Sequence, residues 1–392
     1  MAHILTLNAG SSSLKFGVFE AVSEPAELIA GLIENIGDGD THLRLKSTAN
    51  TVLDDRVLPG AEGADHAGAL TAALAALEVH VPGLNVVSIG HRVVHGGMDF
   101  SEPAKLTQGT IAALEKLVPL APLHQPANLT GIRAAIEAFP GVTQVACFDT
   151  AFHRKHSFVH DTFGLPKEYY QKGVRRYGFH GMSYDYIAGR LADMSPELGT
   201  GRVIVAHLGN GASMCAIKNG ASVSSTMGFS ALDGLPMGTR TGQLDPGVML
   251  YLMQQEGLSA DEISDLVYKK SGLKGMSGIS NDMRTLEASD DPAAKEAIDY
   301  FCARIQREIG GLAATIGGLD TLVFTGGIGE NSVTIREQVC TGMGWIGIEL
   351  DATRNSARGQ TVISTDASSV EVMVVPTNEE LVIARAAAKI WG

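Results

Sequence analysis

The sequence predicts an α/β protein built from two related halves that grip a nucleotide. Residues 4–19 contain an apolar run, a turn of small residues and a second alternating run, which is the pattern of a β-hairpin. The same order returns at residues 203–217, about half a chain later, again with glycine, asparagine and serine in the turn. A hairpin pattern that recurs in this way indicates an internal duplication.

A third glycine-rich turn is predicted at residues 326–332, directly after a strand at 319–325. Glycine has no Cβ, so the backbone N–H groups of such turns and the hydroxyls of nearby serines can approach an anion closely. Lys15 follows the first turn and supplies a positive charge. Any one of these turns could be an ordinary polar loop, but three together favour a phosphate site. The chain has no Gly-x-x-x-x-Gly-Lys-Ser/Thr motif, so this site is not a P-loop.

Length and composition restrict the function further. A chain of 392 residues with 45% hydrophobic residues can form two domains that each bury a core. The net charge of −13 argues against nucleic-acid binding and against an anionic membrane surface. The four cysteines lie far apart and are expected to be buried thiols rather than disulfide partners or zinc ligands. Without a signal-peptide pattern or an apolar run of about 20 residues, the chain is expected to be a soluble cytoplasmic protein.

Apolar periodicity predicts the other elements. The predicted strands are residues 41–47, 86–90, 142–148 and 373–376, and the predicted helices are 67–78, 184–192, 262–270, 293–312 and two that begin at Pro126 and at 377–380. In the helix after Pro126, we expect Leu129, Ile132 and Ile136 to form a core stripe. At the start of the last helix, the spacing of Thr377 and Glu380 has the form of a capping box.

Two arginines and two acids have the surroundings of binding residues. Arg92 and Arg240 are each flanked by glycine in a predicted loop, where a guanidinium can serve as a fixed fork for carboxylate or phosphate oxygens. Asp149 follows a predicted strand, at the edge of an open α/β sheet where ligands bind. Glu379 lies in the first turn of the last helix, where it could serve the helix dipole or, beside a phosphate site, hold Mg²⁺.

The histidines divide into two groups. His124 and His180 are held between prolines or glycines, which suits a binding role as well as a histidine bound only to backbone. His153, His156 and His160 have a spacing that suggests a metal site. No cysteine or well-placed acid completes a zinc set, so we expect surface histidines there.

Nine segments, taken in order, resemble the acetokinase family. They are residues 8–15, 90–97, 122–126, 148–153, 175–181, 207–211, 237–240, 327–331 and 376–381, so the resemblance runs from the first strand to the last helix. It implies the fold of sugar kinases, actin and the heat-shock chaperone ATPases, with two duplicated actin-like (ribonuclease H-like) domains and a nucleotide cleft between them. We therefore expect an acyl- and phosphate-binding domain at residues 1–150, completed by a helix at 378–392, and a nucleotide-binding domain at 151–377. The resemblance also implies a homodimer.

The reaction implied by this resemblance is reversible, direct in-line transfer of the γ-phosphoryl group of ATP to acetate, giving ADP and acetyl phosphate. Such a transfer requires positioning and charge neutralisation rather than a protein nucleophile. Arg92 and Arg240 are expected to hold the acyl carboxylate and the equatorial phosphoryl oxygens. His180 is expected to donate a hydrogen bond to the phosphoryl group, with His124 as a further catalytic residue. Acetate is already ionised at pH 7, so Asp149 need not act as a general base and is expected to orient an arginine or the water around the metal.

The resemblance also assigns ligands to the metal, the acyl chain and the nucleotide. Asn8 and Glu379 are expected to position Mg²⁺, for which Mn²⁺ can substitute. Val94, Leu123 and Phe179 are expected to form the apolar acyl pocket, while Lys15 is expected to contact substrate and nucleotide. The expected nucleotide-binding residues are His207, Leu208, Gly209, Asn210, Gly211, Asp282, Met283, Arg284, Gly327, Ile328, Gly329, Glu330 and Asn331.

The chain departs from the family pattern at a few positions and leaves other functions open. Met182 and Tyr184 stand in a segment where the family usually has Thr-Ser-His, and Gln243 stands where an aspartate is common. Ala231 replaces a usual proline and could enlarge the acyl pocket, whereas Val94 favours acetate; one methylene there is worth only about 1–3 kcal/mol. Phosphorylation of propionate or another short-chain acid is therefore the alternative. An actin-like or chaperone-like ATPase and a histidine-rich metal hydrolase are more distant alternatives.

Overall fold

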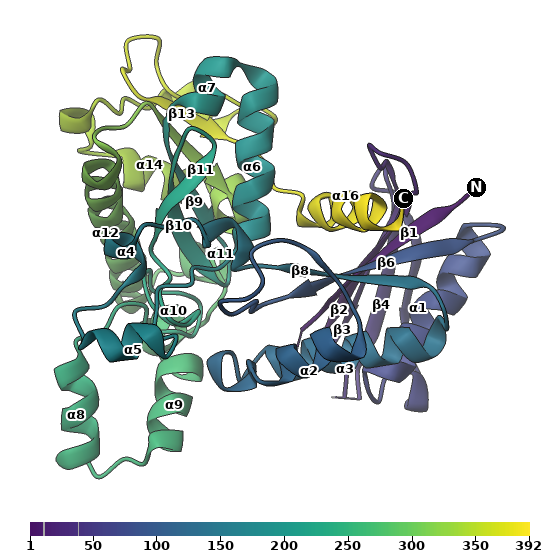
Figure 1. Cartoon of the computed structure of the whole chain (residues 1–392). Helices are drawn as coiled ribbons and strands as arrows, with labels where there is room; N and C mark the ends of the chain where they lie inside the picture. Colours follow the sequence, from purple (N-terminus) through teal and green to yellow (C-terminus); the bar gives the residue numbers. More distant parts are fainter. Residues whose placement is uncertain (11, 38) are drawn as a thin grey trace. The chain divides into compact units, whose positions relative to one another are not determined.

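The structure, a computed structural model, describes residues 1–10, 12–37 and 39–392 (Figure 1). The chain divides into two compact units. Unit 1 comprises Met1–Phe152 together with Asn378–Gly392, and unit 2 comprises His153–Thr377. Residue 11, in the first predicted glycine-rich turn, lies outside the described residues.

Unit 1 is built around an eight-stranded sheet. Its strands are β1 (His3–Ala9), β2 (Leu14–Glu20), β3 (Glu27–Glu34), β4 (His42–Ser47), β5 (Val52–Val57), β6 (Val86–Val93), β7 (Ala104–Lys105) and β8 (Thr143–Phe148), in the spatial order β5-β4-β3-β2-β1-β6-β8-β7. The predicted first hairpin is confirmed, because β1 and β2 pair antiparallel with Asn8 opposite Lys15. Strands β1, β6 and β8 run parallel, so their carboxyl ends lie at one edge of the sheet.

Helices cover both faces of the unit 1 sheet. They are α1 (His66–His80), α2 (Gln108–Glu115), α3 (Gln125–Ala138) and α16 (Glu379–Trp391), with the 3₁₀ turns η1 (Gly60–Glu62) and η2 (Val118–Leu120). Successive residues of β6 point to opposite faces. Ile89 joins the apolar core beneath α1, while a side chain at Gly90 would collide with Ile383 of α16. The C-terminal helix therefore packs on the face opposite α1, as Figure 1 also shows.

Unit 2 repeats the central part of this sheet. Its strands are β9 (Arg202–Leu208), β10 (Ala212–Lys218), β11 (Ala221–Ser225), β12 (Thr321–Thr325) and β13 (Glu371–Val374), in the order β11-β10-β9-β12-β13. The first three strands are antiparallel neighbours, and β9, β12 and β13 are parallel. Order and direction match β3-β2-β1-β6-β8 of unit 1, so the duplication inferred from the recurring hairpin is confirmed.

Most of the helices belong to unit 2. They are α4 (Phe158–Asp161), α5 (Lys167–Gln171), α6 (Gly181–Met194), α7 (Pro196–Thr200), α8 (Pro246–Gln254), α9 (Ala260–Lys269), α10 (Gly272–Ser277), α11 (Met283–Glu287), α12 (Pro292–Ile316), α13 (Gly326–Asn331), α14 (Val333–Cys340) and α15 (Ala352–Ser356), with the turns η3 (Ala151–His153), at the boundary with unit 1, and η4 (Gly344–Ile346). The long helix α12 packs against β9 and β10 and buries an apolar stripe that consists of Ile298, Phe301, Ile305, Ile309 and Leu312. Among the described residues, no helix combines the length and apolar character that crossing a bilayer requires.

Three local predictions are wrong. The third glycine-rich turn is the short helix α13. Ile136 is 38% exposed, because the buried face of α3 is centred on Asn128, Ile132 and Ala135 and leaves Ile136 at its margin. The last helix has no capping box at Thr377, since the side chain of Asn378 accepts the hydrogen bond from the N–H of Leu381.

Candidate active site

In unit 1, three parallel strands bring polar residues of the predicted site to one sheet edge. Asn8 lies near the end of β1, Arg92 near the end of β6, and Asp149 directly after β8. Arg92 donates two hydrogen bonds to the carboxylate of Asp149, from Nε to Oδ1 (3.0 Å) and from Nη2 to Oδ2 (2.6 Å). Its Nη1 donates to Oδ1 of Asn8 at 3.2 Å. The predicted pairing of Asp149 with an arginine is thus observed.

The fixed guanidinium keeps one side toward solvent. The Arg92 side chain is 21% exposed, whereas that of Asp149 is only 2% exposed. Burial by itself would lower the pKa of Arg92, but the negative charges of Asp149 and Glu379 outweigh it and raise the pKa. Arg92 is therefore a permanent cation, held in one orientation by a buried carboxylate.

The N-terminus of α16 adds two carboxylates beside this arginine. Glu380 forms an ion pair with Lys15 of β2, with 2.6 Å between Oε1 and Nζ. Burial raises the pKa of Glu379, as does the nearby charge of Glu380, although Arg92 and Lys15 oppose the shift. A carboxylate ionised at such a cost is stabilised by an added cation. Oxygen atoms such as those of Asn8 and Glu379 are the ligands that Mg²⁺ and Mn²⁺ prefer. Among the described residues, no group of three or more His, Cys, Asp and Glu side chains is placed to bind a metal ion by itself.

Two amides of α3 fix the loop that follows β6, and the sequence reasoning missed both. Oδ1 of Asn128 accepts from the N–H of Val94 (2.9 Å), while its Nδ2 donates to the carbonyl of Ala9 (2.7 Å). Gln125 exchanges hydrogen bonds with the backbone of His95 in the same way. Both side chains are fully buried. Two polar residues on the otherwise apolar face of this helix are the sequence feature that could have revealed them.

The predicted acyl-pocket and histidine residues differ in exposure. Val94 is 4% exposed, Leu123 is 38% exposed, and Phe179, which belongs to unit 2, is 2% exposed. His124 is half-buried at the N-terminal cap of α3. In unit 1, Val94 belongs to the loop that Asn128 and Gln125 hold, and His124 directly precedes Gln125 in the chain.

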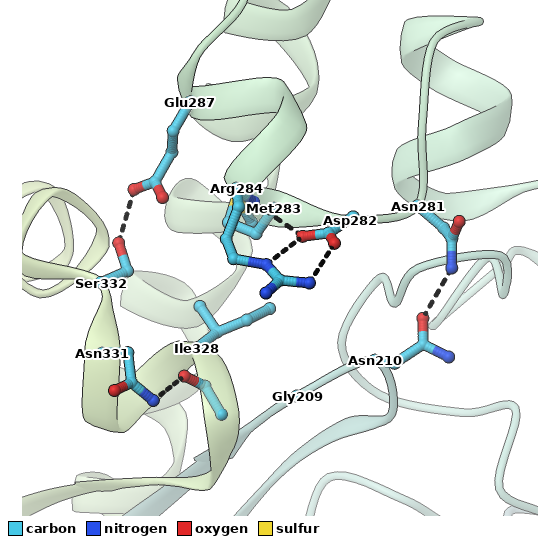
Figure 2. A pocket seen from close by; sticks show the side chains of 11 residues that line it. Gly209, Asn210, Asn281, Asp282, Met283, Arg284, Glu287, Ile328, Asn331 and Ser332 are labelled. Atoms are coloured by element: carbon cyan, nitrogen blue, oxygen red, sulfur yellow. Dashed lines mark hydrogen bonds and ion pairs between the residues drawn. The ribbon is translucent and has the colours of Figure 1, made fainter. Parts of the chain in front are cut away.

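Unit 2 contains a cavity of about 690 Å³, a size typical of small-molecule sites. It is lined by Gly209, Asn210, Asn281, Asp282, Met283, Arg284, Glu287, Gly327, Ile328, Asn331 and Ser332 (Figure 2). Eight of these are among the thirteen residues of unit 2 predicted to bind nucleotide; His207, Leu208, Gly211, Gly329 and Glu330 are not among the lining residues. The prediction omitted Asn281 and Glu287, which carry no glycine-rich signal, and Ser332, which ends the predicted glycine-rich segment 326–332 but was not assigned to the nucleotide.

Side-chain pairs organise the walls of this cavity, as Figure 2 shows. Arg284 donates to both carboxylate oxygens of Asp282 at 3.0 and 2.6 Å, and Ser332 donates to Glu287 at 2.5 Å. Asn281 reaches Oδ1 of Asn210 at 3.3 Å. Between these polar pairs, Met283 and Ile328 supply apolar surface. The mixture of an apolar wall and a few polar groups suits a heterocyclic base and ribose.

Gly326 allows the end of β12 to lie close to the end of β9. Its φ of +77° is the left-handed region, and a Cβ there would lie 2.8 Å from the carbonyl oxygen of Leu208. Its N–H donates to Oε1 of Glu330 at 2.9 Å, and the same oxygen accepts from the N–H of Thr377 at 3.2 Å. The carboxylate of Glu330 therefore holds the backbone of Gly326 and Thr377 together.

His180 lies at the N-terminal cap of α6 in a left-handed conformation, with φ 56° and ψ 25°. A non-glycine residue in this region costs about 1–3 kcal/mol and persists only when its surroundings hold it, which is common at functional sites. The His180 ring stacks on His207 with 4.3 Å between centroids and 21° between planes. Its Nδ1 lies 2.8 Å from Oγ of Ser213, and Ser183 holds Nδ1 of His207 at the same distance.

Gly211 brings the predicted phosphoryl-binding residues of unit 2 together. A Cβ at this position would lie 3.4 Å from Nε2 of His180 and 3.9 Å from Nη1 of Arg240. The same Nη1 donates to the carbonyl of Ala231 at 2.9 Å. A donor and a cation thus flank one glycine, as an anion site requires.

The expectation of surface histidines at 153, 156 and 160 is wrong for His153, which is fully buried. Oγ of Ser222 lies 2.8 Å from Nδ1 of His153 and 2.7 Å from Nε2 of His156, and Nε2 of His153 lies 3.0 Å from the carbonyl of Phe179. Burial lowers the pKa of His153 to about 4 and that of His156 to about 2. Both imidazoles are therefore neutral at pH 7, and their hydrogen bonds to Ser222 and Phe179 hold the loop before His180.

Comparisons with known proteins agree with this architecture. Residues 3–385 match the model of the acetokinase family. An acetate kinase of Methylocella silvestris is 53% identical over 97% of this chain and 96% of its own.

Solved structures agree as well. The crystal structure of Porphyromonas gingivalis acetate kinase is similar over the full length of both chains, with 40% identity and a TM-score of 0.87. A propionate kinase from Francisella tularensis covers 99% of this chain and 100% of its own, with 36% identity and a TM-score of 0.92. The predicted fold of two duplicated actin-like domains is confirmed by these similarities, and the chain belongs to the acetokinase family.

Proposed function

We propose that this protein is an acetate kinase that transfers the γ-phosphoryl group of ATP reversibly to acetate. The observation that carries this proposal is Arg92, a permanent cation fixed by a buried Asp149 beside two carboxylates at one sheet edge. An actin-like or chaperone-like ATPase has no use for such an arginine. The 53% identity to a relative named acetate kinase supports the same assignment.

In the forward reaction, a carboxylate oxygen of acetate attacks the γ-phosphorus in line with the leaving group. A P–O bond to acetate forms while the bond to the β-phosphate bridging oxygen breaks, so that acetyl phosphate and ADP result. The developing charge on the phosphoryl oxygens requires donors and cations already in place. Arg92 supplies one cation, and Arg240 with Nε2 of His180 supplies the other contacts.

Different residues are proposed to bind the nucleotide and the metal. The unit 2 cavity is proposed to hold the adenosine part of ATP or ADP against Ile328 and Met283. Asn8 and Glu379 are proposed to position Mg²⁺, for which Mn²⁺ can substitute, mainly through its water. The metal supplies charge neutralisation of the phosphates when bound. Lys15 is proposed to act near the phosphates, at the end of the hairpin and held by Glu380.

The acyl preference separates two candidate substrates. Val94 is buried and restricts the space for an acyl chain, which favours acetate, while the similarity to a propionate kinase keeps propionate as the second candidate. Turnover with Mg-ATP and acetate, propionate or butyrate, with hydroxylamine trapping of acyl phosphate, tests both. A kcat/KM highest for acetate supports the proposal, a maximum at propionate selects the second candidate, and no acyl phosphate overturns both.

We also propose a homodimer in the cytoplasm. Val248, Leu250, Tyr251 and Met253 are 40–54% exposed on α8, an apolar surface that a second copy of the chain would cover. The four cysteines are buried thiols, as suits a reducing compartment. Leu250→Glu should convert the dimer to a monomer in analytical ultracentrifugation, and an unchanged mass would place the interface elsewhere.

A further inference from the structure

Tyr184 forms the end of a hydrogen-bond chain that reaches His180. Its phenol oxygen lies 2.5 Å from Oγ of Ser213, and that Oγ lies 2.8 Å from Nδ1 of His180. Tyr184 and Ser213 are both fully buried, so bulk water does not reach these two hydroxyls. From the structure, we infer that Tyr184 is a positioning residue that acts through Ser213 to fix the protonation pattern of the His180 ring.

The chemistry of the three groups sets the direction of the chain. Serine has a single hydroxyl hydrogen, so Ser213 can donate either to His180 or to Tyr184, but not to both. The phenol is the stronger donor of the two hydroxyls. When Tyr184 donates to Ser213, the serine hydrogen points to Nδ1 of His180, and the ring proton of a neutral His180 must then sit on Nε2.

That tautomer is the one the proposed function requires, and the inference rests on it. Nε2 is the ring atom of His180 that faces Gly211 and Arg240, so a proton on Nε2 is directed toward the proposed phosphoryl site. With the proton on Nδ1 instead, Nε2 would present a lone pair to an anion. Fixing the tautomer in the resting enzyme therefore places the donor before substrate arrives.

Stacking contributes a different restraint, because it acts on the plane of the ring and not on its tautomer. Stacking on His207 holds the plane, and Ser183 holds His207 in turn. Ser183 and Tyr184 follow His180 in the first turn of α6, so one helical turn supplies both restraints. The chain through Ser213 reaches Nδ1 of the His180 ring directly.

The primary test is ¹⁵N NMR of the imidazoles in the full-length protein without nucleotide, with His180 assigned by comparison with His180→Asn. In the wild type, we expect the Nε2–H tautomer. Tyr184→Phe keeps the ring but removes the hydroxyl, and should convert the His180 signals to a mixture of tautomers. Ser213→Ala should do the same. Tyr170→Phe, which loses a phenol hydrogen bond to Asp161 elsewhere in unit 2, should leave His180 unchanged.

Kinetics provide the second readout. Tyr184→Phe should lower kcat about tenfold with the KM values for ATP and acetate within about twofold, because a donor is misdirected rather than a ligand removed. Combining Tyr184→Phe with Ser213→Ala should cost no more than Ser213→Ala alone, since both changes break one chain.

The outcomes separate the two ideas. An unchanged His180 tautomer in Tyr184→Phe overturns the inference, whatever happens to turnover. A changed tautomer with unchanged kcat supports the positioning by Tyr184 but overturns the proposed donor role of His180. A changed tautomer with lowered kcat supports both.

Discussion

The two units contain the same five-strand arrangement, yet the carboxyl ends of their parallel strands carry different residues. In unit 1, these ends present Asn8, Arg92 and Asp149, joined by hydrogen bonds and ion pairs. In unit 2, β9 ends in a glycine-containing turn and β12 runs into the glycine-rich helix α13, and both border a cavity whose wall mixes polar pairs with Met283 and Ile328. One scaffold thus supports a rigid charged cluster in one copy and a cavity in the other, because the strand ends tolerate different residues while the core fixes the strands.

The largest expected effect comes from removing the charge of the unit 1 cluster. Arg92→Ala should lower turnover by about 10³-fold, since a fixed cation at the reacting group is lost. It should also reduce the free energy of unfolding by about 3–5 kcal/mol, because Asp149 remains buried without its partner. Steady-state kinetics and urea unfolding measure the two effects.

Two further variants separate charge from geometry at this position. Arg92→Lys keeps a cation but lacks the planar fork, so it should unfold closer to the wild type and still lose turnover by about 10²-fold. Arg133→Ala removes an arginine whose ion pair with Glu115 lies at the surface, and it should change neither property measurably. Near-wild-type turnover of Arg92→Ala would contradict the site assignment.

A smaller effect is expected from filling the unit 2 cavity. Ile328→Trp places a larger ring against the cavity wall, and should raise the KM for ATP about tenfold while the KM for acetate stays within about twofold. The matched control is Met194→Trp at the exposed end of α6. An increase confined to the KM for acetate would contradict the proposal that the unit 2 cavity binds the adenosine part of ATP.

The same contrast explains what the sequence could predict. Recurring apolar runs are local, so the duplicated hairpins and the buried stripe of α12 were predictable from periodicity. Asp149 was found from its strand-end position and Arg92 from its neighbouring glycines, although the predicted loop at Arg92 is wrong because β6 continues to Val93. The bond between the two joins residues 57 positions apart. Asn128, Ser213 and Ser222 were missed because each acts only through partners that the fold brings close. Residues 326–332 were predicted as a turn because glycine is a poor helix former, but Gly326–Asn331 form the short helix α13.

Glu379 provides a test in which function and stability oppose each other. The pKa of Glu379 is raised in the folded state. Its contribution to the free energy of unfolding is therefore fully present below the unfolded pKa of about 4.3, and it is lost as the pH rises through the folded pKa. Glu379→Gln should therefore raise the melting temperature of the ligand-free protein by about 2–4 °C at pH 7.5. The same variant should need a higher Mg²⁺ concentration for half-maximal turnover. Glu24→Gln, which affects only a surface pair with Arg385 of α16, should do neither, and an unchanged Mg²⁺ requirement in Glu379→Gln would remove it from the metal site.

The smallest effect concerns the buried histidines of unit 2. The pKa values of His153 and His156 lie near 4 and 2 in the folded protein, against about 6.5 when unfolded. A group with a lowered pKa contributes stability above its unfolded value, and this stability is lost as pH falls from about 6.5 toward the folded pKa. The melting temperature should therefore fall between pH 7 and pH 5, less steeply in His156→Gln because one of the two groups no longer titrates.

NMR decides whether these two histidines cause that slope. The Cε1–H signals of His153 and His156 should stay at their neutral positions from pH 7.5 to pH 5, because protonation in the folded state requires a lower pH. Titration of either signal near pH 6.5 would show that water reaches Ser222 and its two imidazoles. The loop before His180 would then be open, and the left-handed conformation of His180 would depend on the turn of α6 alone.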